Sequence, residues 1–159
     1  MPQLAVGDPA PDFTLCTADG GRITLSALRG QSVVIFFFPA AMTPGCTLEA
    51  GDFRDVQPDL RDAGFQVLGI SPDPVPKLAA FAAAESLTYP LASDVDRAVL
   101  RAYGAWGEKK LYGKVLEGVI RTTVVVDPDG RVALALALAQ YNVKATGHVG
   151  RLRRELAPA

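Results

Sequence analysis

Cys46 stands in a sequence setting that favours a reactive thiolate. The segment Pro39-Ala-Ala-Met-Thr-Pro-Gly-Cys46 follows a continuous apolar run and leads into a helical pattern. Thr43 is predicted to cap this helix, and Pro44 then takes the first helical position, where its missing N–H costs nothing. Cys46 falls at the third helical position, where unpaired N–H groups and the positive end of the helix dipole both favour a charged sulfur. We therefore predict that the pKa of Cys46 lies below the ~8.5 of a free cysteine.

The neighbours of Cys46 favour one kind of thiol chemistry over others. Gly45 leaves room for a small molecule to approach the sulfur, and Thr43 stands where a Cys-x-x-Cys dithiol would need its first cysteine. The alternative for a lone cysteine is a small buried apolar residue, and the Pro-Gly turn at a helix start argues against it. A Cys–His hydrolase pair would need His148 beside Cys46, and nothing in the sequence favours that. Reaction of a single thiolate with one electrophile fits best.

The elements that must position this segment alternate between strands and helices, which predicts an α/β sheet with helices on its faces. The apolar run at 33–38 is typical of a strand covered on both faces, and chemistry is expected in the loop after such a central strand. Residues 13–15 and 23–25 flank Asp19-Gly-Gly21 and predict a short hairpin. The other predicted strands are 65–70, 122–126 and 131–139.

Four helices are predicted from apolar periodicity. The first has a stripe that ends at Gly64, and Pro58 inside it is expected to kink the helix or restart it. The others cover 75–87, 95–103 and 146–156. The stripe of the first helix consists of Ala50, Phe53, Val56, Leu60 and Ala63. Trp106-Gly107 with Lys109 and Lys110 is interpreted as a solvated loop, with a loop beside the pocket as the alternative.

Length and composition exclude several classes of protein. The 159 residues are predicted to form one domain, and 49% hydrophobic residues allow a sizeable core. The formal net charge of −1 argues against nucleic acid or an anionic membrane as the main partner. Two cysteines make neither a disulfide scaffold nor, with one histidine, an all-Cys/His zinc site. Without a visible signal peptide or membrane span, we expect a cytoplasmic protein whose thiols are reduced.

Several motifs together resemble one known family. Pro39-x-x-x-Thr43-x-x-Cys46 resembles the active-site signature of the peroxiredoxins. The run Phe36-Phe-Phe-Pro-Ala-Ala-Met-Thr-Pro-Gly-Cys-Thr-Leu-Glu-Ala50, followed by Phe53-Arg-Asp55, is similar to the bacterioferritin-comigratory-protein (BCP, or PrxQ) subgroup. The likeness extends across nearly the whole chain through Gly7-Asp-Pro-Ala-Pro-Asp-Phe13, Val67-Leu-Gly-Ile-Ser71, Leu91-Ala-Ser-Asp94, Trp106-Gly-Glu-Lys109 and Arg121-Thr-Thr-Val-Val-Val-Asp127.

The resemblance implies a fold, an activity and roles for single residues. The fold would be thioredoxin-like, of the peroxiredoxin type, with a central mixed β-sheet, helices on both faces and an N-terminal β-hairpin. Cys46 would be the peroxidatic cysteine, Thr43 would hydrogen-bond the peroxide and the sulfur, and Pro39 would shape and shield the pocket. Arg121 would help to hold the thiolate and the substrate oxygens; taken alone it would be a solvated charge at a strand end. Glu49 either orients Arg121 or is an ordinary first-turn carboxylate.

The sequence departs from the subgroup at the residue that reduces oxidised Cys46. Many relatives carry a second cysteine five residues later, where this chain has Gly51, and others carry it in the helix that corresponds to 75–87, which here has none. Gly51 inside a helix costs ~1 kcal/mol relative to Ala, so the Cys46 helix is expected to loosen readily. Cys16 is the other thiol, and a disulfide needs Cα atoms within about 7 Å. A one-cysteine enzyme is favoured, with Cys16 as an atypical resolving residue the alternative.

The expected function is therefore a thiol peroxidase that acts on hydrogen peroxide and small organic hydroperoxides without a metal or organic cofactor. Its sulfenic acid would be reduced by thioredoxin, glutathione or another low-molecular-weight thiol. The rivals are a peroxide sensor that passes its oxidation to a partner, and a holdase that binds unfolded chains. A monomer suits the resemblance, and a Cys46–Cys46 bridge between two chains is the alternative.

Overall fold

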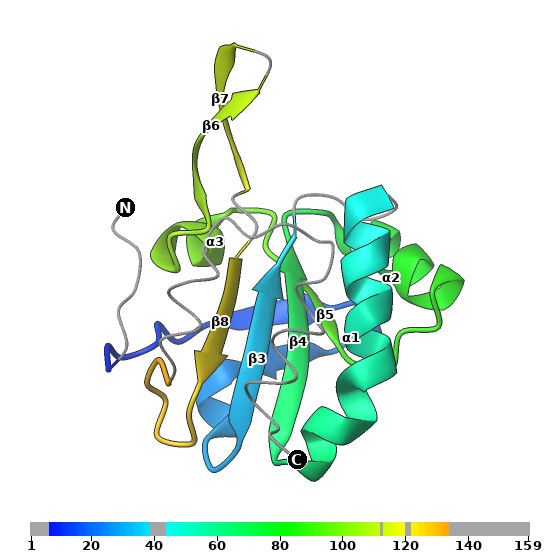
Figure 1. Ribbon diagram of the computed structural model, residues 1–159, viewed down its shortest axis with the longest axis vertical. Helices are drawn as coiled ribbons and strands as arrows, with labels where there is room; N and C mark the ends of the chain where they lie inside the picture. Colours follow the sequence, from blue (N-terminus) through cyan, green and yellow to red (C-terminus); the bar gives the residue numbers. More distant parts are fainter. Residues whose placement is uncertain (1–6, 39–43, 112, 120–121, 134–159) are drawn as a thin grey trace.

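The computed structural model describes the chain over residues 7–38, 44–111, 113–119 and 122–133 (Figure 1). The elements in chain order are β1 (Thr14–Thr17), β2 (Arg22–Thr24), the 3-10 helix η1 (Leu25–Leu28), β3 (Ser32–Phe37), α1 (Pro44–Asp62), β4 (Phe65–Ser71), α2 (Val75–Ala84), β5 (Leu91–Ser93), α3 (Ala98–Ala102), β6 (Trp106–Leu111), β7 (Lys114–Val119) and β8 (Thr122–Val126). The predicted hairpin is confirmed as β1 and β2, in which Leu15 pairs with Ile23.

Six of these strands form one mixed sheet in the order β2-β1-β5-β4-β3-β8. The three central strands β5, β4 and β3 run parallel, because α1 and α2 return the chain to the same edge each time. The flanking strands β1 and β8 pair antiparallel with β5 and β3. An α/β sheet with an N-terminal hairpin is what the residue pattern predicted, and its mixed strand directions are those that the family resemblance implied.

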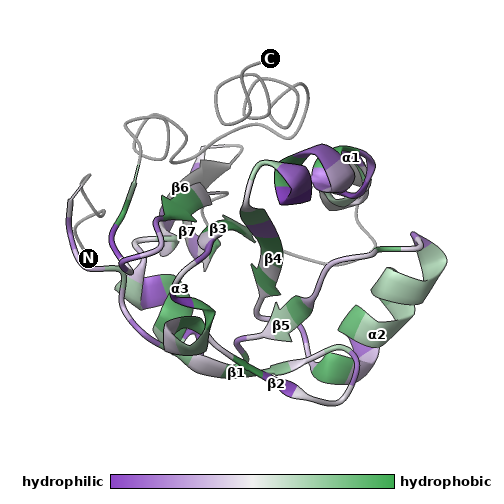
Figure 2. Cartoon of the chain, turned by 90° about the horizontal axis from the view of Figure 1, so that it is seen from below, coloured by the Kyte–Doolittle hydropathy of each residue, from purple (hydrophilic) through white to green (hydrophobic). Residues whose placement is uncertain are grey.

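Strand β3 divides its aromatic side chains between the two faces of the sheet. Phe36 and Phe38 lie in the core under α1 and α2, whereas Phe37 lies in the core on the side of α3. Figure 2 shows α1 and α2 on one side of the sheet and α3 on the other. The Phe36 ring also uses the space over Gly69, where a Cβ would lie 2.8 Å from its Cζ atom. The β3 run is therefore buried on both faces, as its continuous apolar sequence predicted.

Helix α1 is continuous through Pro58 and does not restart there. Proline removes one backbone hydrogen bond and costs about 3 kcal/mol in a helix interior. Full burial of Phe53 and Leu60, on either side of Pro58, offsets this cost at about 2 kcal/mol or more for each side chain. Gly64 takes a φ of +91° just past the helix, so α1 ends where the sequence predicted.

Two helices are shorter than predicted. Helix α2 ends at Ala84 rather than at residue 87, and Ser86 has a φ of +53° that does not fit a helix. Helix α3 starts at Ala98 rather than at residue 95, because Arg97 has a φ of +62°. Asp94 lies before this start, and its carboxylate accepts a hydrogen bond from the N–H of Leu100.

The segment interpreted as a solvated loop at Trp106-Gly107 is a strand. It forms β6, which pairs antiparallel with β7 in a separate two-stranded sheet, and the hairpin projects from the body of the domain (Figure 1). The Trp106 ring lies under the guanidinium groups of Arg97 and Arg101, at 4.9 and 5.8 Å from its centroid. Packing of Trp106 against α3 thus fixes the base of the hairpin, which a loop-like sequence with two lysines did not reveal.

The predicted C-terminal elements lie almost entirely outside the described residues. Of the predicted strand 131–139, only its first three residues are described, and Val132 forms an isolated bridge with Val126. The predicted helix 146–156 and His148 lie outside the described residues. Within the part of the chain that the structure describes, no helix is long and apolar enough to cross a membrane.

Candidate active site

The central strand β3 brings the chain to the carboxyl edge of the sheet, directly before the predicted reactive segment. Phe38, one residue past β3, is fully buried, and its N–H donates a 3.0 Å hydrogen bond to the carbonyl of Ile70 in β4. The chain re-enters the described structure at Pro44, the first residue of α1. The helix start that we predicted from Thr43 and Pro44 is therefore confirmed at Pro44, while Pro39 and Thr43 themselves lie outside the described residues.

Cys46 is the third residue of α1, as predicted, and its backbone belongs to the first turn of a 19-residue helix. Its side chain lies outside the described part of the structure, as does that of Glu49. The first turn carries no acidic residue, so Glu49, the sixth residue of α1, is not the first-turn carboxylate given as one of its two predicted roles. A thiolate at Cys46 would therefore not compete with a carboxylate for the free N–H groups and the positive end of the helix dipole.

The nearest carboxyl on α1 with a described side chain is that of Asp52. Burial raises the pKa of this carboxyl, the neighbouring carboxylate of Asp55 adds to the shift, and Arg54 opposes it. Asp52 lies six residues beyond Cys46, more than one helical turn away. The acidic side chains of α1 that the structure describes thus all lie beyond the first turn.

The expected arginine partner, Arg121, lies outside the described residues, but the residue that follows it is placed at the same edge of the sheet. Thr122 is the first residue of β8. It is fully buried and has Phe37 as its Cα partner in the register of β8 and β3. The sheet therefore brings the start of β8 beside the end of β3, which is the strand that leads to Cys46.

Cys16 is a free, exposed cysteine in β1. It pairs with Ser93 of β5, and Ser93 pairs with Ser71 of β4. Ser71 and Phe38 are the next residues after the paired Ile70 and Phe37, so this row reaches the end of β3. Three strand spacings separate Cys16 from Phe38, or about 14 Å. Cys16 thus lies at the carboxyl edge of the sheet, but well away from the strand that leads to Cys46.

Helix α1 is tied to residues 85–89, which connect α2 to β5. The Tyr89 hydroxyl donates a hydrogen bond to the carbonyl of Ala50, and Arg54 and Gln57 also bond to this segment. These contacts join residues 31 to 39 positions apart in the chain. Sequence analysis missed them, because Tyr89 reads as an ordinary core aromatic and nothing in the local pattern signals its partner.

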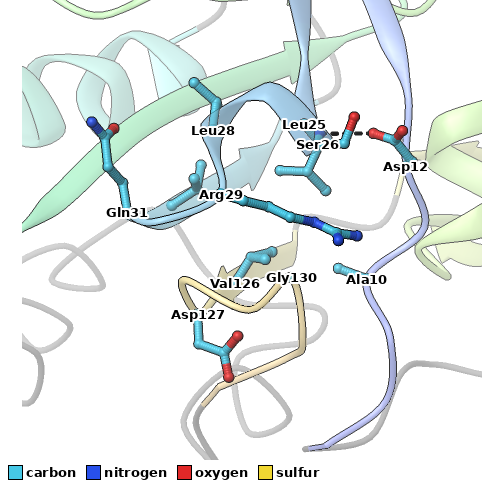
Figure 3. A pocket seen from close by; sticks show the side chains of 11 residues that line it. Ala10, Asp12, Leu25, Ser26, Leu28, Arg29, Gln31, Val126, Asp127 and Gly130 are labelled. Carbon is cyan, nitrogen blue, oxygen red and sulfur yellow. Dashed lines mark hydrogen bonds between the residues drawn. The ribbon is translucent and has the colours of Figure 1, made fainter.

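A separate cavity lies at the opposite end of β3 (Figure 3). Figure 3 shows the Arg29 side chain extending across it toward Ala10. Its volume of about 10 Å³ suits a single water molecule rather than a hydroperoxide. It is lined by Ala10, Asp12, Leu25, Ser26, Leu28, Arg29, Gln31, Val33, Val126, Asp127 and Gly130. Among the described residues, no group of three or more His, Cys, Asp and Glu side chains is arranged to hold a metal ion.

Comparison with known proteins gives one consistent result. The model of the AhpC/TSA family matches residues 6–135. The Mycobacterium tuberculosis protein named "Putative peroxiredoxin Rv2521" is 56% identical over 154 residues, which cover 97% of this chain and 96% of that protein. Peroxiredoxin Bcp of Escherichia coli K12 is 44% identical over 132 residues, which cover 83% of this chain and 85% of Bcp.

Solved structures agree with the sequence relatives. The bacterioferritin comigratory protein of Xanthomonas campestris superposes with a TM-score of 0.86 at 35% identity, covering 96% of this chain and 97% of that one. A cysteine-to-serine mutant of PrxQ from Xylella fastidiosa superposes with a TM-score of 0.88 at 28% identity, covering 98% and 97% of the two chains. These structures share the thioredoxin-like arrangement that the described residues show.

Proposed function

The chain belongs to the AhpC/TSA family and is a thiol-dependent peroxidase of the Bcp/PrxQ type, and from this premise we propose that Cys46 is its peroxidatic cysteine. The observation that carries the proposal is the place of Cys46 in the fold. It is the third residue of a long helix that starts at the carboxyl edge of the sheet, just beyond the central strand β3. Such a helix start stabilises a thiolate, which is the form of cysteine that reacts with peroxides.

In the proposed reaction the Cys46 thiolate attacks the terminal oxygen of a hydroperoxide. A sulfur–oxygen bond forms, the O–O bond breaks, and the leaving oxygen takes up a proton to become water or an alcohol. The sulfur is oxidised by two electrons to a sulfenic acid. Thr43 and Arg121 would donate hydrogen bonds to the peroxide oxygens and so stabilise the charge that develops on the leaving oxygen. Pro39 would shield the sulfur, and Gly45 would leave space for the substrate.

The sulfenic acid must then be reduced by a thiol. We assign this step to an external thiol, because Gly51 occupies the position of the nearby second cysteine and Cys16 lies about 14 Å along the sheet from the end of β3. The external thiolate attacks the Cys46 sulfur, the sulfur–oxygen bond breaks, the hydroxide takes up a proton to become water, and a mixed disulfide forms. A second thiol then releases Cys46 as a thiolate. Thioredoxin supplies both thiols in one molecule, and a low-molecular-weight thiol supplies them in two.

The substrate class and the setting of the enzyme follow from the same family membership. Alkyl peroxide reduction is the activity named for the Xanthomonas campestris relative, so we propose organic hydroperoxides beside hydrogen peroxide as substrates. We further propose that the enzyme acts as a monomer in the cytoplasm, where thioredoxin and small thiols keep cysteines reduced.

Substitution of the two cysteines tests the proposal directly. Wild type, Cys16→Ser and Cys46→Ser are treated with one equivalent of hydrogen peroxide and examined by intact mass and non-reducing electrophoresis. We expect a gain of about 16 Da in wild type and in Cys16→Ser, and no gain in Cys46→Ser. Peroxide consumption with thioredoxin and its reductase is expected to persist in Cys16→Ser and to stop in Cys46→Ser. Peroxide treatment that left Cys46 unmodified would overturn the assignment. A loss of about 2 Da that requires both cysteines would instead make Cys16 the resolving residue.

Arg121 is tested by removal of its charge with a similar side-chain length. Arg121→Gln is expected to lower kcat/KM for hydrogen peroxide about 10²- to 10³-fold, the usual effect of removing one donor to a developing anion. Arg131→Gln is the matched control, because the Arg131 guanidinium is exposed and bonds the carbonyl of Gly7. Equal activity of the two variants would remove Arg121 from the site.

A further inference from the structure

The Tyr89 hydroxyl reaches across the core to the helix that carries Cys46. It donates a 2.7 Å hydrogen bond to the carbonyl of Ala50, and only 4% of the Tyr89 surface is exposed. Ala50 lies one helical turn beyond Cys46, and in an α-helix its N–H is the group that pairs with the Cys46 carbonyl. The tyrosine therefore bonds to the residue whose own N–H closes the helical turn that starts at Cys46.

Two further side chains hold α1 to the connection between α2 and β5. The Arg54 guanidinium donates a 2.6 Å hydrogen bond from Nη1 to the carbonyl of Glu85. Gln57 and Thr88 are joined twice, since the Thr88 hydroxyl donates to Gln57 Oε1 and Gln57 Nε2 donates to the Thr88 carbonyl. These contacts fix the middle of the helix, so among the bonds from this connection to α1 the Tyr89 bond is nearest to Cys46 in sequence.

The first half of α1 depends on such tertiary hydrogen bonds because its own sequence has a low helix propensity. Gly51 adjoins Ala50 and costs about fivefold in local helix population relative to Ala. On that ground the sequence led us to expect a helix that loosens readily around Cys46. The structure adds an opposing factor, a buried hydroxyl that bonds to the backbone one residue before Gly51.

We propose that Tyr89 is a positioning residue for the chemistry of Cys46, an inference that rests on the proposed role of Cys46. Its hydroxyl keeps the turn from Cys46 to Ala50 helical, and with it the alignment of the sulfur with its hydrogen-bond donors. Reaction with a small peroxide depends on this fixed alignment. Attack by the sulfur on a bulky disulfide depends on access instead, which the folded helix limits. Removal of the hydroxyl should therefore change the two reactions in opposite directions.

A second tyrosine provides a matched control. Tyr103 is also buried, and its hydroxyl donates a 2.6 Å hydrogen bond to the carbonyl of Pro11 on the other face of the sheet. Tyr89→Phe and Tyr103→Phe therefore remove the same atom from the same kind of bond. Each keeps the ring, and in Tyr89 that ring packs edge-on against Phe36 with centroids 5.7 Å apart. Both variants are made in a Cys16→Ser background so that Cys46 is the reacting thiol.

Each variant is assayed for its rate constant with hydrogen peroxide and for its rate with the chromogenic disulfide 5,5′-dithiobis(2-nitrobenzoate). In the second assay the Cys46 thiolate attacks the reagent, its S–S bond breaks, and a coloured thiolate leaves. For Tyr89→Phe we expect the peroxide rate constant to fall about fivefold and the disulfide rate to rise about fivefold, the usual size of one lost hydrogen bond. For Tyr103→Phe we expect both rates within about twofold of the parent.

Hydrogen exchange followed by mass spectrometry gives an independent readout. Peptides covering the first half of α1 should exchange faster in Tyr89→Phe than in Tyr103→Phe, while peptides from α3 should not. Equal rates in the two variants, or faster exchange spread over the whole chain, would overturn the role of Tyr89. If Cys46→Ser still reduced peroxide, the proposed role of Cys46 would fail instead, whatever the tyrosine variants did.

Discussion

On the face of the sheet covered by α1 and α2, Tyr89 donates its hydroxyl hydrogen to a helix, whereas on the α3 face Tyr103 donates its own to the irregular segment before β1. The two bonds are 2.7 and 2.6 Å long, and both join residues far apart in the chain. Ala50, the acceptor on the first face, is part of a helix with its own internal bonds. Pro11, the acceptor on the second face, belongs to no helix or strand.

The surroundings of the two tyrosines explain the difference. Near Pro11, the Asp12 carboxylate accepts hydrogen bonds from the N–H groups of Phe13 and Ser26, so this segment is fixed by several side-chain contacts that close the core. Near Ala50 the comparable contacts act on a helix that already has internal hydrogen bonds of its own. A tyrosine hydrogen bond thus fixes an irregular segment on the α3 face. On the face of α1 and α2, the same kind of bond controls how firmly the turn after Cys46 is held.

The aromatic pair in β3 offers the strongest way to separate stability from reactivity. Phe36→Ala and Phe37→Ala each open a cavity and should lower the free energy of unfolding by about 3–5 kcal/mol. Phe36 stacks on Phe53 of α1 with centroids 4.5 Å apart, whereas Phe37 packs against Tyr103 at 5.4 Å. We expect only Phe36→Ala to lower the peroxide rate constant beyond what the unfolded fraction explains.

Urea unfolding followed by circular dichroism gives the free energies, and peroxide consumption at low temperature gives the rates of the folded fraction. The comparison of faces would be wrong if the two variants lost equal stability and equal activity. It would be sharpened if Phe53→Leu, which alters the same stack from the helix side, reproduced the loss of activity seen in Phe36→Ala.

The sequence predicted the elements whose burial pattern is local. The run at β3 and the hairpin around Asp19 were recognisable because apolar periodicity and turn residues act over a few positions. The start of α1 at Pro44 followed from helix capping preferences in the same way. Cys46, the proposed reactive cysteine, could therefore be placed on its helix from neighbouring residues alone.

Contacts between distant segments could not be predicted in this way. Tyr89 and Ala50 are 39 residues apart, and a buried tyrosine could satisfy its hydroxyl at many carbonyl groups. The β6–β7 hairpin was missed because Trp106 is held by Arg97, just before α3, and by Arg101 of α3, which no local pattern shows. Helices α2 and α3 are shorter than predicted because Ser86 and Arg97 have positive φ angles, which the periodicity of apolar residues does not predict.

The glycines within and just after α1 give smaller effects of opposite sign. At Gly51 a Cβ would lie 3.6 Å from Arg54 Nη2, an ordinary contact, so Gly51→Ala should raise the free energy of unfolding by about 1 kcal/mol. Gly64 has a φ of +91°, so Gly64→Ala should lower it by about 1 kcal/mol. Urea unfolding measures both.

The same pair bears on reactivity. Because Gly51 adjoins Ala50, Gly51→Ala should also slow hydrogen exchange in the first half of α1 and slow attack on bulky disulfides, without lowering the peroxide rate constant. Gly64→Ala should leave these readouts unchanged, since it acts at the far end of the helix. A destabilised Gly51→Ala would show that the turn after Cys46 is held in a form that a helix former does not favour.

The smallest effect concerns the buried carboxyl of Asp94, which lies in the connection between β5 and α3. Burial raises the pKa of Asp94 above its ordinary value of 3.8, and the N–H groups of Leu100 and Val99 oppose this shift. A raised pKa in the folded state means that the protonated form favours folding. This contribution is complete below pH 3.8 and is lost as the pH rises through the higher value of the folded state. Relative to Asp94→Asn, wild type should therefore lose stability as the pH rises from acid toward neutral.

Asp12 supplies the control of opposite sign on the same face. The N–H of Ser26 lowers the pKa of Asp12, so its contribution to stability is present above the ordinary value of 3.8 and is lost as the pH falls. Because Asp12 is exposed, solvent screening keeps this effect small. Urea unfolding of wild type, Asp94→Asn and Asp12→Asn at several pH values should give difference curves that slope in opposite directions. Parallel slopes would show that Asp94 keeps its charge in the folded protein at no cost, and that the α3 face tolerates a buried ion because α3 solvates it with backbone N–H groups.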